Sequence, residues 1–465
     1  MTYSRRNFLR TVGATALVGS TAALSPSIFS AHAATVSGYK ALVCLFLYGG
    51  LDSHDMLVPY DQDSYNSYSD IRQSMINQYA GGSRSRSNLL PLQTGSASNL
   101  SGMQMALPPE MAATKTLFDN GDAAFVSNVG PLIEPVTRST FENGAALPPR
   151  LFSHNDQQAT WQASAPEGAQ EGWGGLFADA ILDAGGNSGA ETFSNITIAD
   201  SGPFLIGKQA FPYQIGFRGP SSVFALEGLN EDDISAEEAD LANRLKQTLM
   251  AQNFSSGHIL EQDMANALRG AFEANDKFAN AARNAGSVTT PFGGDPVSAQ
   301  LKAVAETIAL RDVLGTNRQI FFVALGGFDT HDAQAAALPA RLKMINDGVS
   351  SFNAAMKELG LNDDVTLFTA TDFGRTLAVN GDGTDHGWGG HQLVVGGAVK
   401  GGEIYGTMPE AKVDHDQDSG GGRLIPTLSV EQYAAPLGSW FGLGPSELST
   451  ALPRLGNFDP GPGFI

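Results

Sequence analysis

The chain has 465 residues, of which 48 are acidic and 28 are basic, so its formal net charge is −20. A hydrophobic content of 42% with 16% charged residues is typical of a globular protein. The negative charge argues against a nucleic-acid-binding protein, because a phosphate backbone would be repelled. The one cysteine, Cys44, excludes an intramolecular disulfide and a cysteine-rich metal site.

The N-terminus contains the three parts of an export signal in the correct order. Residues 5–10 (RRNFLR) are basic, residues 11–29 are moderately apolar, and residues 31–33 (AHA) match a cleavage pattern. This order predicts a twin-arginine signal peptide over residues 1–33, although a basic first helix of the fold is the alternative. We therefore expect the twin-arginine machinery as an export partner and a periplasmic or extracellular location.

Residues 34–465 are expected to form a single exported domain without stable membrane insertion, because no later segment reaches the roughly 18 apolar residues that a span requires. Apolar runs predict strands that are buried on both faces, as in a parallel sheet. These runs are residues 40–48, 122–129, 318–325, 364–371 and 391–399.

Helical patterns separate these strands, and two polar segments interrupt them. The predicted helices lie in residues 235–284 (two or three helices, broken near 255–257), 299–314 and 333–359. Residues 60–105 are interpreted as a surface insertion and residues 405–425 as loop. Alternation of strands and helices from residue 318 onward predicts βαβ units in a doubly wound α/β sheet.

Aspartate and histidine side chains follow several of the predicted strands. Ligands bind at the carboxyl ends of strands in open α/β sheets, so we expect these side chains to meet at one edge. Carboxylates and neutral imidazoles bind zinc, manganese or iron, and carboxylate-rich sites bind calcium or magnesium. Each motif alone has a structural alternative, such as a helix cap or a surface turn. The candidate ligands are Asp52, Asp329, His331, Asp372, His386 and His391.

Two further residues are candidates for catalysis. Ser153 is predicted to begin a helix, where the positive end of the helix dipole would favour a nucleophilic alkoxide. The alternative for Ser153 is a capping-box-like pair with Asp156. Arg375 is predicted to clamp an anionic substrate, because a guanidinium binds phosphate or sulfate in bidentate fashion, or to pair with one of the many carboxylates.

Several of these motifs occur together in a known family. They are GG-x-D at residues 49–52 with VPY at 58–60, Ser153-His154, GGFDTH at 326–331, FGRT at 373–376, TDHGWGGH at 384–391, and the glycine pairs at 396–397 and 401–402. With this set the chain resembles a family of twin-arginine-exported bacterial proteins, domain of unknown function 1501. That family looks like a branch of the alkaline-phosphatase and sulfatase superfamily.

The resemblance implies a three-layer α/β/α sandwich with a mostly parallel central sheet. It also implies one or two divalent metal ions (zinc, or calcium, magnesium or manganese) and a serine nucleophile that attacks a small anionic phosphate or sulfate ester. Carried over to this chain, Asp52, Asp372 and His386 would hold one metal, which Ser153 would bridge. Asp329, His331 and His391 would hold the other.

A second function remains open from the sequence. The fold could serve in a non-catalytic exported binding or assembly protein, whose partner would be a companion exported protein. A formylglycine-type sulfatase is not expected, because Cys44 lacks the C-x-P-x-R context of that enzyme class.

Overall fold

The computed structural model describes residues 34, 36–217, 219–220, 244, 259–284 and 287–465. The predicted signal peptide lies outside these residues, as does the segment around 255–257 where a helix break is expected. Residues 259–284 form one helix, α9 (Ile259–Asn284). Within the described part of the chain, no helix is both long and apolar enough to cross a membrane.

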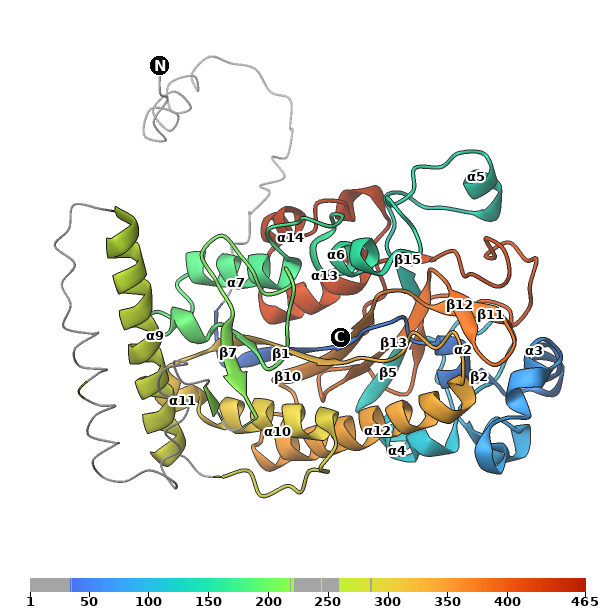
Figure 1. Cartoon of the computed structure of the whole chain (residues 1–465), viewed down its shortest axis with the longest axis horizontal. Helices are drawn as coiled ribbons and strands as arrows, with labels where there is room; N and C mark the ends of the chain where they lie inside the picture. Colours follow the sequence, from blue (N-terminus) through green and yellow to red (C-terminus); the bar gives the residue numbers. More distant parts are fainter. Residues whose placement is uncertain (1–33, 35, 218, 221–243, 245–258, 285–286) are drawn as a thin grey trace, which may run out of the picture. The chain divides into compact units, whose positions relative to one another are not determined.

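A ten-stranded sheet forms the centre of the fold (Figure 1). Its order is β14 (Ile404–Tyr405), β5 (Ala123–Gly130), β13 (Gly390–Val395), β10 (Val365–Thr371), β1 (Lys40–Leu47), β9 (Arg318–Leu325), β6 (Asn195–Thr197), β7 (Tyr213–Gly216) and β8 (Gly219–Pro220), with β15 (Leu428–Ser429) paired to β5. The strand β1 runs parallel to both β9 and β10, and β6 runs parallel to β9. The sheet is therefore mostly parallel.

The last predicted strand has a different length and direction from its neighbours. β13 ends at Val395, before the expected end at residue 399, and it runs antiparallel to both β10 and β5. A bend and a turn follow at Gly396 and Gly397. Because β13 is antiparallel, its first residues lie at the edge where the parallel strands have their carboxyl ends.

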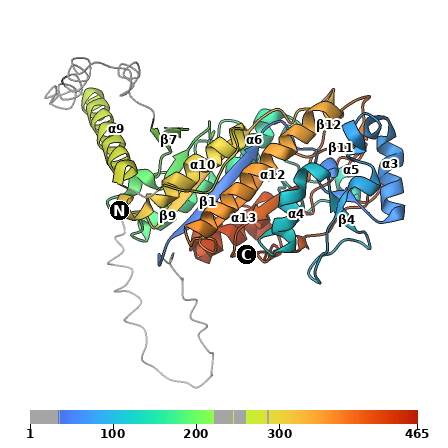
Figure 2. The same ribbon diagram turned by 90° about the horizontal axis from the view of Figure 1, so that it is seen from below.

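Side chains of β1 alternate between two hydrophobic cores, as the two-residue period of a strand requires. Val43 and Leu45 belong to the core under α4 (Ala112–Asp119), α10 (Pro296–Ala309) and α12 (Gln334–Glu358). Leu42 and Phe46 belong to the core under α6 (His154–Ala163), α7 (Trp173–Asp183), α13 (Val430–Phe441) and α14 (Pro445–Ala451). Helices thus cover both faces, which confirms the three-layer α/β/α sandwich (Figures 1 and 2).

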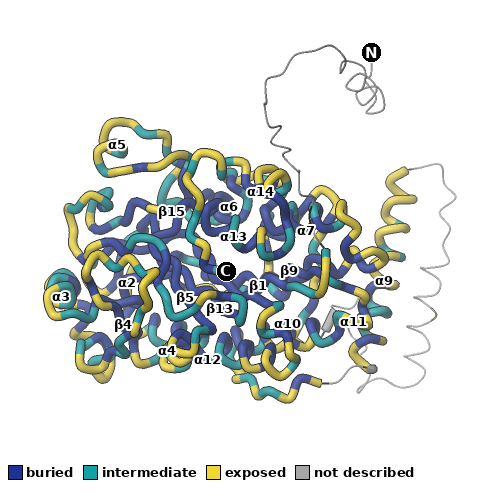
Figure 3. The backbone as a smooth tube through the Cα atoms, turned by 180° about the vertical axis from the view of Figure 1, so that it is seen from behind, coloured by how far each residue is buried: buried dark blue, intermediate teal, exposed yellow. Residues whose placement is uncertain are grey.

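The remaining short elements lie around this sandwich. They are α2 (Ser53–Met56), α5 (Arg138–Glu142), α11 (Arg311–Leu314), and the hairpin of β11 (Arg375–Val379) with β12 (Thr384–His386). The central strands are buried, and exposed residues gather on the outer helices and loops (Figure 3). Burial on both faces explains why the central strands are continuous apolar runs in the sequence.

The segment interpreted as a surface insertion contributes to the interior. It forms α3 (Gln62–Ile76) and β3 (Leu90–Pro91), and it leads into β4 (Met105–Leu107). These two strands form a small sheet with β2 (Val58–Pro59), which directly precedes the segment. The guanidinium of Arg72, on α3, is fully buried and lies 2.6 Å from the Asp52 carboxylate and 2.7 Å from that of Asp55. Asp52 and Asp55 flank the first turn after β1, so α3 supplies the charge that allows their burial.

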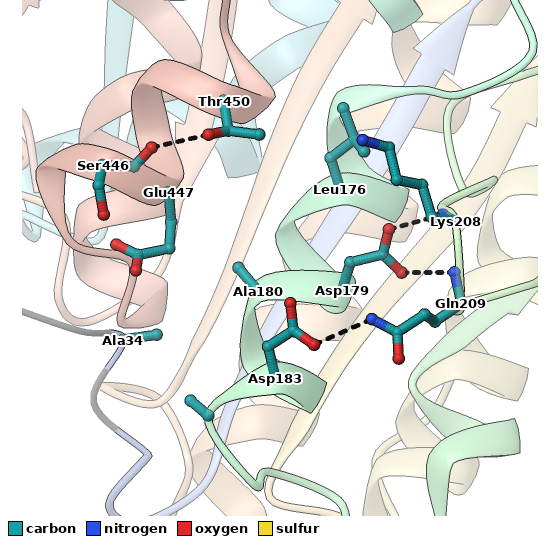
Figure 4. Close-up of a pocket in the computed structure, with 11 residues that line it drawn as sticks. Ala34, Leu176, Asp179, Ala180, Asp183, Lys208, Gln209, Ser446, Glu447 and Thr450 are labelled. Atoms are coloured by element: carbon teal, nitrogen blue, oxygen red, sulfur yellow. Dashed lines mark hydrogen bonds between the residues drawn. The ribbon is translucent and has the colours of Figure 1, made fainter. Parts of the chain in front are cut away.

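A hollow of about 320 Å³ lies between α7 and α14 (Figure 4). On its α7 side, the Asp179 carboxylate accepts hydrogen bonds from the backbone N–H groups of Lys208, Gln209 and Ala210. Asp183 accepts a further bond from the Gln209 amide. These carboxylates therefore hold the 208–210 turn on α7.

The substitution Arg72→Met should lower the free energy of unfolding by about 3–5 kcal/mol, because it leaves two buried carboxylates without their cation. Chemical denaturation measures this loss. The matched control is Lys343→Met, which breaks an exposed pair with Asp347 and should cost about 1 kcal/mol or less. Equal losses in the two variants would contradict the role given to Arg72.

Candidate metal centre

Glycines allow the loops after three strands to meet. Gly49 has φ +110°, and a Cβ atom there would lie 2.4 Å from the backbone nitrogen of Asp329. Gly50 has φ +84°, and its Cβ would lie 2.4 Å from the ring of Phe373. Side chains are excluded by both the backbone conformation and the space. The loops after β1, β9 and β10 consequently pack against one another.

The carboxylate of Asp329, just after β9, lies among three imidazoles. The Nε2 atoms of His331 and His386 lie 3.0 Å and 3.1 Å from its Oδ1 atom, and Nε2 of His154 lies 3.5 Å from its Oδ2 atom. The Nε2 atoms of His331 and His386 are only 2.9 Å apart. Ligand atoms of His154, Asp329 and His386 all lie within 4.8 Å of one another. We call His154, Asp329, His331 and His386 the Asp329 cluster.

The other ring nitrogen of each histidine faces an oxygen acceptor. Nδ1 of His154 lies 2.6 Å from Asp372, Nδ1 of His386 lies 2.7 Å from the Phe152 carbonyl, and Nδ1 of His331 lies 3.4 Å from Asp385. In the tautomer that carries its proton on Nδ1, each imidazole donates to this acceptor and has a lone pair on Nε2 for a cation. Histidines that bind metals are oriented in this way by their outer partners.

Asp372, at the end of β10, supports His154 and has spare acceptor capacity. Its Oδ2 atom also accepts hydrogen bonds from the Gly49 backbone and the Gln158 amide. Its Oδ1 atom is buried and has no partner among the described residues. A buried carboxylate oxygen without a partner is costly unless a cation or a donor approaches it. In front of it, three imidazoles and the Asp329 carboxylate form a donor set that fits a zinc-type cation.

Arg375 lies behind Asp329, away from solvent. Its Nη1 atom donates to Asp329 at 2.7 Å and to the Gly49 carbonyl, while its other nitrogens donate to Thr384. Partial burial acts to raise the pKa of Asp329, but the hydrogen bond and charge of Arg375 outweigh it and hold the pKa below its usual value. The structure therefore gives Arg375 the role of positioning the Asp329 carboxylate and keeping it ionised.

The environments of two cluster histidines shift their pKa values in opposite directions. The hydrogen bond to Asp372 raises the pKa of His154. Burial lowers the pKa of His386. A bound cation would compete with protons at His154 in particular, because metal ligation requires the neutral imidazole.

Ser153 occupies the N-cap position of α6, directly before His154. Its side chain makes no capping hydrogen bond, and Asp156 pairs with Arg150 at 3.2 Å. The hydroxyl of Ser153 is therefore not used in the expected capping box. It lies at the positive end of a ten-residue helix, and the next residue in the sequence is His154 of the Asp329 cluster.

Two of the six predicted ligands lie apart from the cluster. Asp52 is buried and accepts hydrogen bonds from Arg72 and the Gln334 amide. His391, at the start of β13, accepts a hydrogen bond at Nδ1 from the Asn128 backbone and packs edge-on against His54 with ring centroids 6.4 Å apart. The structure therefore brings together Asp329, His331 and His386, with Asp372 one hydrogen bond behind them.

Sequence reasoning did not include His154 among the ligands. The residues sought were those directly after strands, whereas His154 is the first residue of a helix that is far from the other ligands in the sequence. Its position next to the candidate nucleophile is the signal that could have identified it.

The chain belongs to the family described as "Protein of unknown function (DUF1501)", whose model matches residues 39–420. A search of curated proteins finds no match. Among solved structures, the PsFucS1 sulfatase from Pseudoalteromonas sp. is similar at 10% identity, with a TM-score of 0.34 and coverage of 88% of this chain and 68% of the sulfatase.

Two further structures show similarity of the same order. The C-terminal periplasmic domain of EcEptC from Escherichia coli, in complex with Zn, has 8% identity and a TM-score of 0.37 over 92% of this chain and 88% of that domain. An alkaline phosphatase from the Antarctic bacterium TAB5 has 9% identity and a TM-score of 0.27 over 78% and 92%. At such values the similarity does not extend to function, so the function must be argued from this chain's own residues.

Protein stability should fall as the pH drops below about 6.5, the usual histidine value in an unfolded chain. Burial lowers the pKa of both His54 and His391 to about 3. Between pH 6.5 and 3 the unfolded chain therefore binds protons that the folded chain does not, at a cost approaching 1.4 kcal/mol per pH unit for each histidine. Urea denaturation at several pH values measures the slope.

The variant His391→Asn isolates one of these two contributions. The amide oxygen of asparagine can accept the Asn128 hydrogen bond that Nδ1 accepts in the native chain. The number of protons taken up on unfolding, which the slope of stability against pH measures, should decrease by about one in this variant. An unchanged slope would show that His391 is not buried in its neutral form.

Proposed function

We propose that this protein is an exported metal-dependent hydrolase of phosphate or sulfate esters. The observation that carries the proposal is the Asp329 cluster, in which three imidazole Nε2 atoms converge on one carboxylate while each Nδ1 atom faces an oxygen acceptor. Export by the twin-arginine route, and a periplasmic or extracellular location, are part of the same proposal and are supported by the pattern of residues 1–33.

The residues proposed to hold the cation are His154, Asp329, His331 and His386. A bound zinc-type cation would supply Lewis-acid polarisation of an ester oxygen. Asp372 orients His154 from behind, and Arg375 orients Asp329. Because both supports are buried, the ligand side chains are held without large rotamer freedom, as a preorganised site requires.

Ser153 is the proposed nucleophile. Its Oγ atom attacks the phosphorus or sulfur centre, the bond to the leaving-group oxygen breaks, and the serine proton is released. Water then attacks the same centre, the bond to Oγ breaks, and phosphate or sulfate leaves with Ser153 regenerated. The N-terminus of α6 favours the negative charge that develops near Oγ. Overall, one ester and one water yield one alcohol and one inorganic anion.

The variant His154→Ala should bind Zn²⁺ at least about 100-fold more weakly than the native chain, because it removes one imidazole from the Asp329 cluster. The change is measured by calorimetric titration of chelator-treated protein. Asp372→Asn should weaken binding about 10- to 100-fold, since it disturbs only the orientation of His154.

The matched control for metal binding is His391→Asn, whose Zn²⁺ affinity should equal that of the native chain because this imidazole lies beside Asn128 and His54. Loss of affinity in this control with full affinity in His154→Ala would overturn the assignment of ligands.

The variant Ser153→Ala should lose turnover by about 1,000-fold or more while retaining Zn²⁺ affinity, because covalent catalysis ends but the ligands remain. Turnover is followed with p-nitrophenyl phosphate, bis-p-nitrophenyl phosphate and p-nitrocatechol sulfate. Asn155→Ala, at an exposed position of α6 two residues after Ser153, is the matched control and should retain turnover. Absence of turnover of all three esters by the zinc-loaded native chain would contradict a hydrolase and favour a binding protein.

A further inference from the structure

A cavity of about 410 Å³ lies in front of the Asp329 cluster. His331 and His386 form part of its wall, so a molecule in the cavity contacts the same imidazoles that face Asp329. The remaining wall comes from α5, from the residue before Ser153, from β12 and from the 405–425 loop. The residues that complete it are Phe141, Phe152, Asp385, Ser419 and Arg423. This volume suits a small molecule, because ligand pockets typically measure about 300–1,000 Å³.

Arg423 is the guanidinium that this cavity presents, in contrast to Arg375, whose side chain is inaccessible to solvent. Nε of Arg423 donates to the His386 carbonyl at 2.9 Å, and Nη1 donates to the Gly420 carbonyl at 2.9 Å. Its Nη2 atom has no hydrogen-bond partner among the described residues. Two bonds therefore hold the guanidinium in place while Nη2 stays available to an anion.

Two aromatic rings form the apolar part of the wall. The guanidinium of Arg423 lies 5.5 Å from the centroid of the Phe152 ring, which is within cation–π range. The ring of Phe141 packs against Trp388 with centroids 6.1 Å apart, so its position is fixed from behind. A planar apolar group fits beside such rings, whereas a methyl group is too small to cover their faces.

The backbone of Phe152 has an unusual conformation that serves both the cavity and the cluster. Its φ angle is +72°, a left-handed value that costs energy in a residue with a bulky side chain. Its carbonyl is the acceptor for Nδ1 of His386. One strained residue therefore orients a cluster imidazole with its carbonyl and lines the cavity with its ring.

The negative charge in the cavity wall is already engaged. One carboxylate oxygen of Asp385 accepts a hydrogen bond from the Asn380 amide at 2.8 Å and faces Nδ1 of His331 at 3.4 Å. Asp385 thus faces His331 and Asn380, and Arg423 is the group in the wall that is suited to an incoming anion.

We propose that this cavity is the substrate subsite and that the substrate is a phosphate or sulfate monoester of a small aromatic alcohol. Nη2 of Arg423 donates to a non-bridging oxygen of the ester, and Phe141 and Phe152 contact the aromatic leaving group. The assignment rests on the proposed hydrolase function for its chemistry, but its binding part can be tested without turnover.

The test is calorimetric binding of phenyl phosphate, methyl phosphate and phenyl sulfate to the zinc-loaded Ser153→Ala chain. Phenyl phosphate should bind about 5- to 20-fold more tightly than methyl phosphate. Adding Arg423→Met should weaken both phosphate esters by about 10- to 100-fold, because a charge-assisted hydrogen bond is lost. Adding Phe141→Ala should remove the preference for phenyl phosphate and leave the affinity for methyl phosphate unchanged. The affinity for phenyl sulfate, compared with that for phenyl phosphate, shows which of the two anions the site accepts.

Lys412→Met is the matched control, since it removes an exposed positive charge from the same loop and should change none of these affinities. Zinc affinity of the Arg423→Met chain shows whether the Asp329 cluster is intact, and Phe141→Ala tests the cavity without altering the loop. Equal binding of phenyl and methyl phosphate, or equal weakening by Lys412→Met and Arg423→Met, would overturn the subsite. If the Ser153→Ala chain binds phenyl phosphate preferentially but the zinc-loaded native chain does not hydrolyse it, the result supports the subsite and contradicts the hydrolase.

Discussion

The ion pair between Asp329 and Arg375 is the interaction on which the functional end of the molecule depends. The buried guanidinium of Arg375 needs a counter-ion, and the Asp329 carboxylate supplies it. Three imidazoles approach the same carboxylate. The pair holds the pKa of the Asp329 carboxyl below its usual value, so the cluster offers a negative oxygen among the imidazoles. Loops from the ends of separate strands can meet there only because Gly49 and Gly50 permit close backbone contact.

A chain of hydrogen bonds connects this ion pair to a second buried charge cluster. Thr384 accepts a bond from Arg375 and donates to Gln334, and the Gln334 amide donates to Asp52. Asp52 in turn pairs with Arg72 on α3. Buried ionic groups cost free energy unless each is satisfied, so the two clusters are expected to tolerate substitution poorly. The floor of the site therefore depends on a segment whose polar composition is typical of an exposed loop.

Chemistry and recognition come from different parts of the chain at this edge of the sheet. Residues after β9, on β12 and at the start of α6 form the Asp329 cluster, whereas α5 and the 405–425 loop supply Phe141 and Arg423. Phe152 belongs to both regions through its carbonyl and its ring. Because of this division, substitutions in α5 or in the 405–425 loop would change which leaving group the cavity accepts without altering the metal ligands.

The sequence by itself determined the α/β class, the central strands and the convergence of Asp329, His331 and His386, because buried parallel strands are continuous apolar runs whose ends meet at one edge. It also placed Ser153 at a helix start. Only the tertiary structure decided that Asp52 pairs with Arg72, that Arg375 lies behind Asp329, and that His154 completes the cluster. These outcomes depend on contacts between residues that are 20 positions apart for Asp52 and Arg72, 46 for Asp329 and Arg375, and 218 for His154 and Asp372. Local sequence patterns carry no information on such contacts.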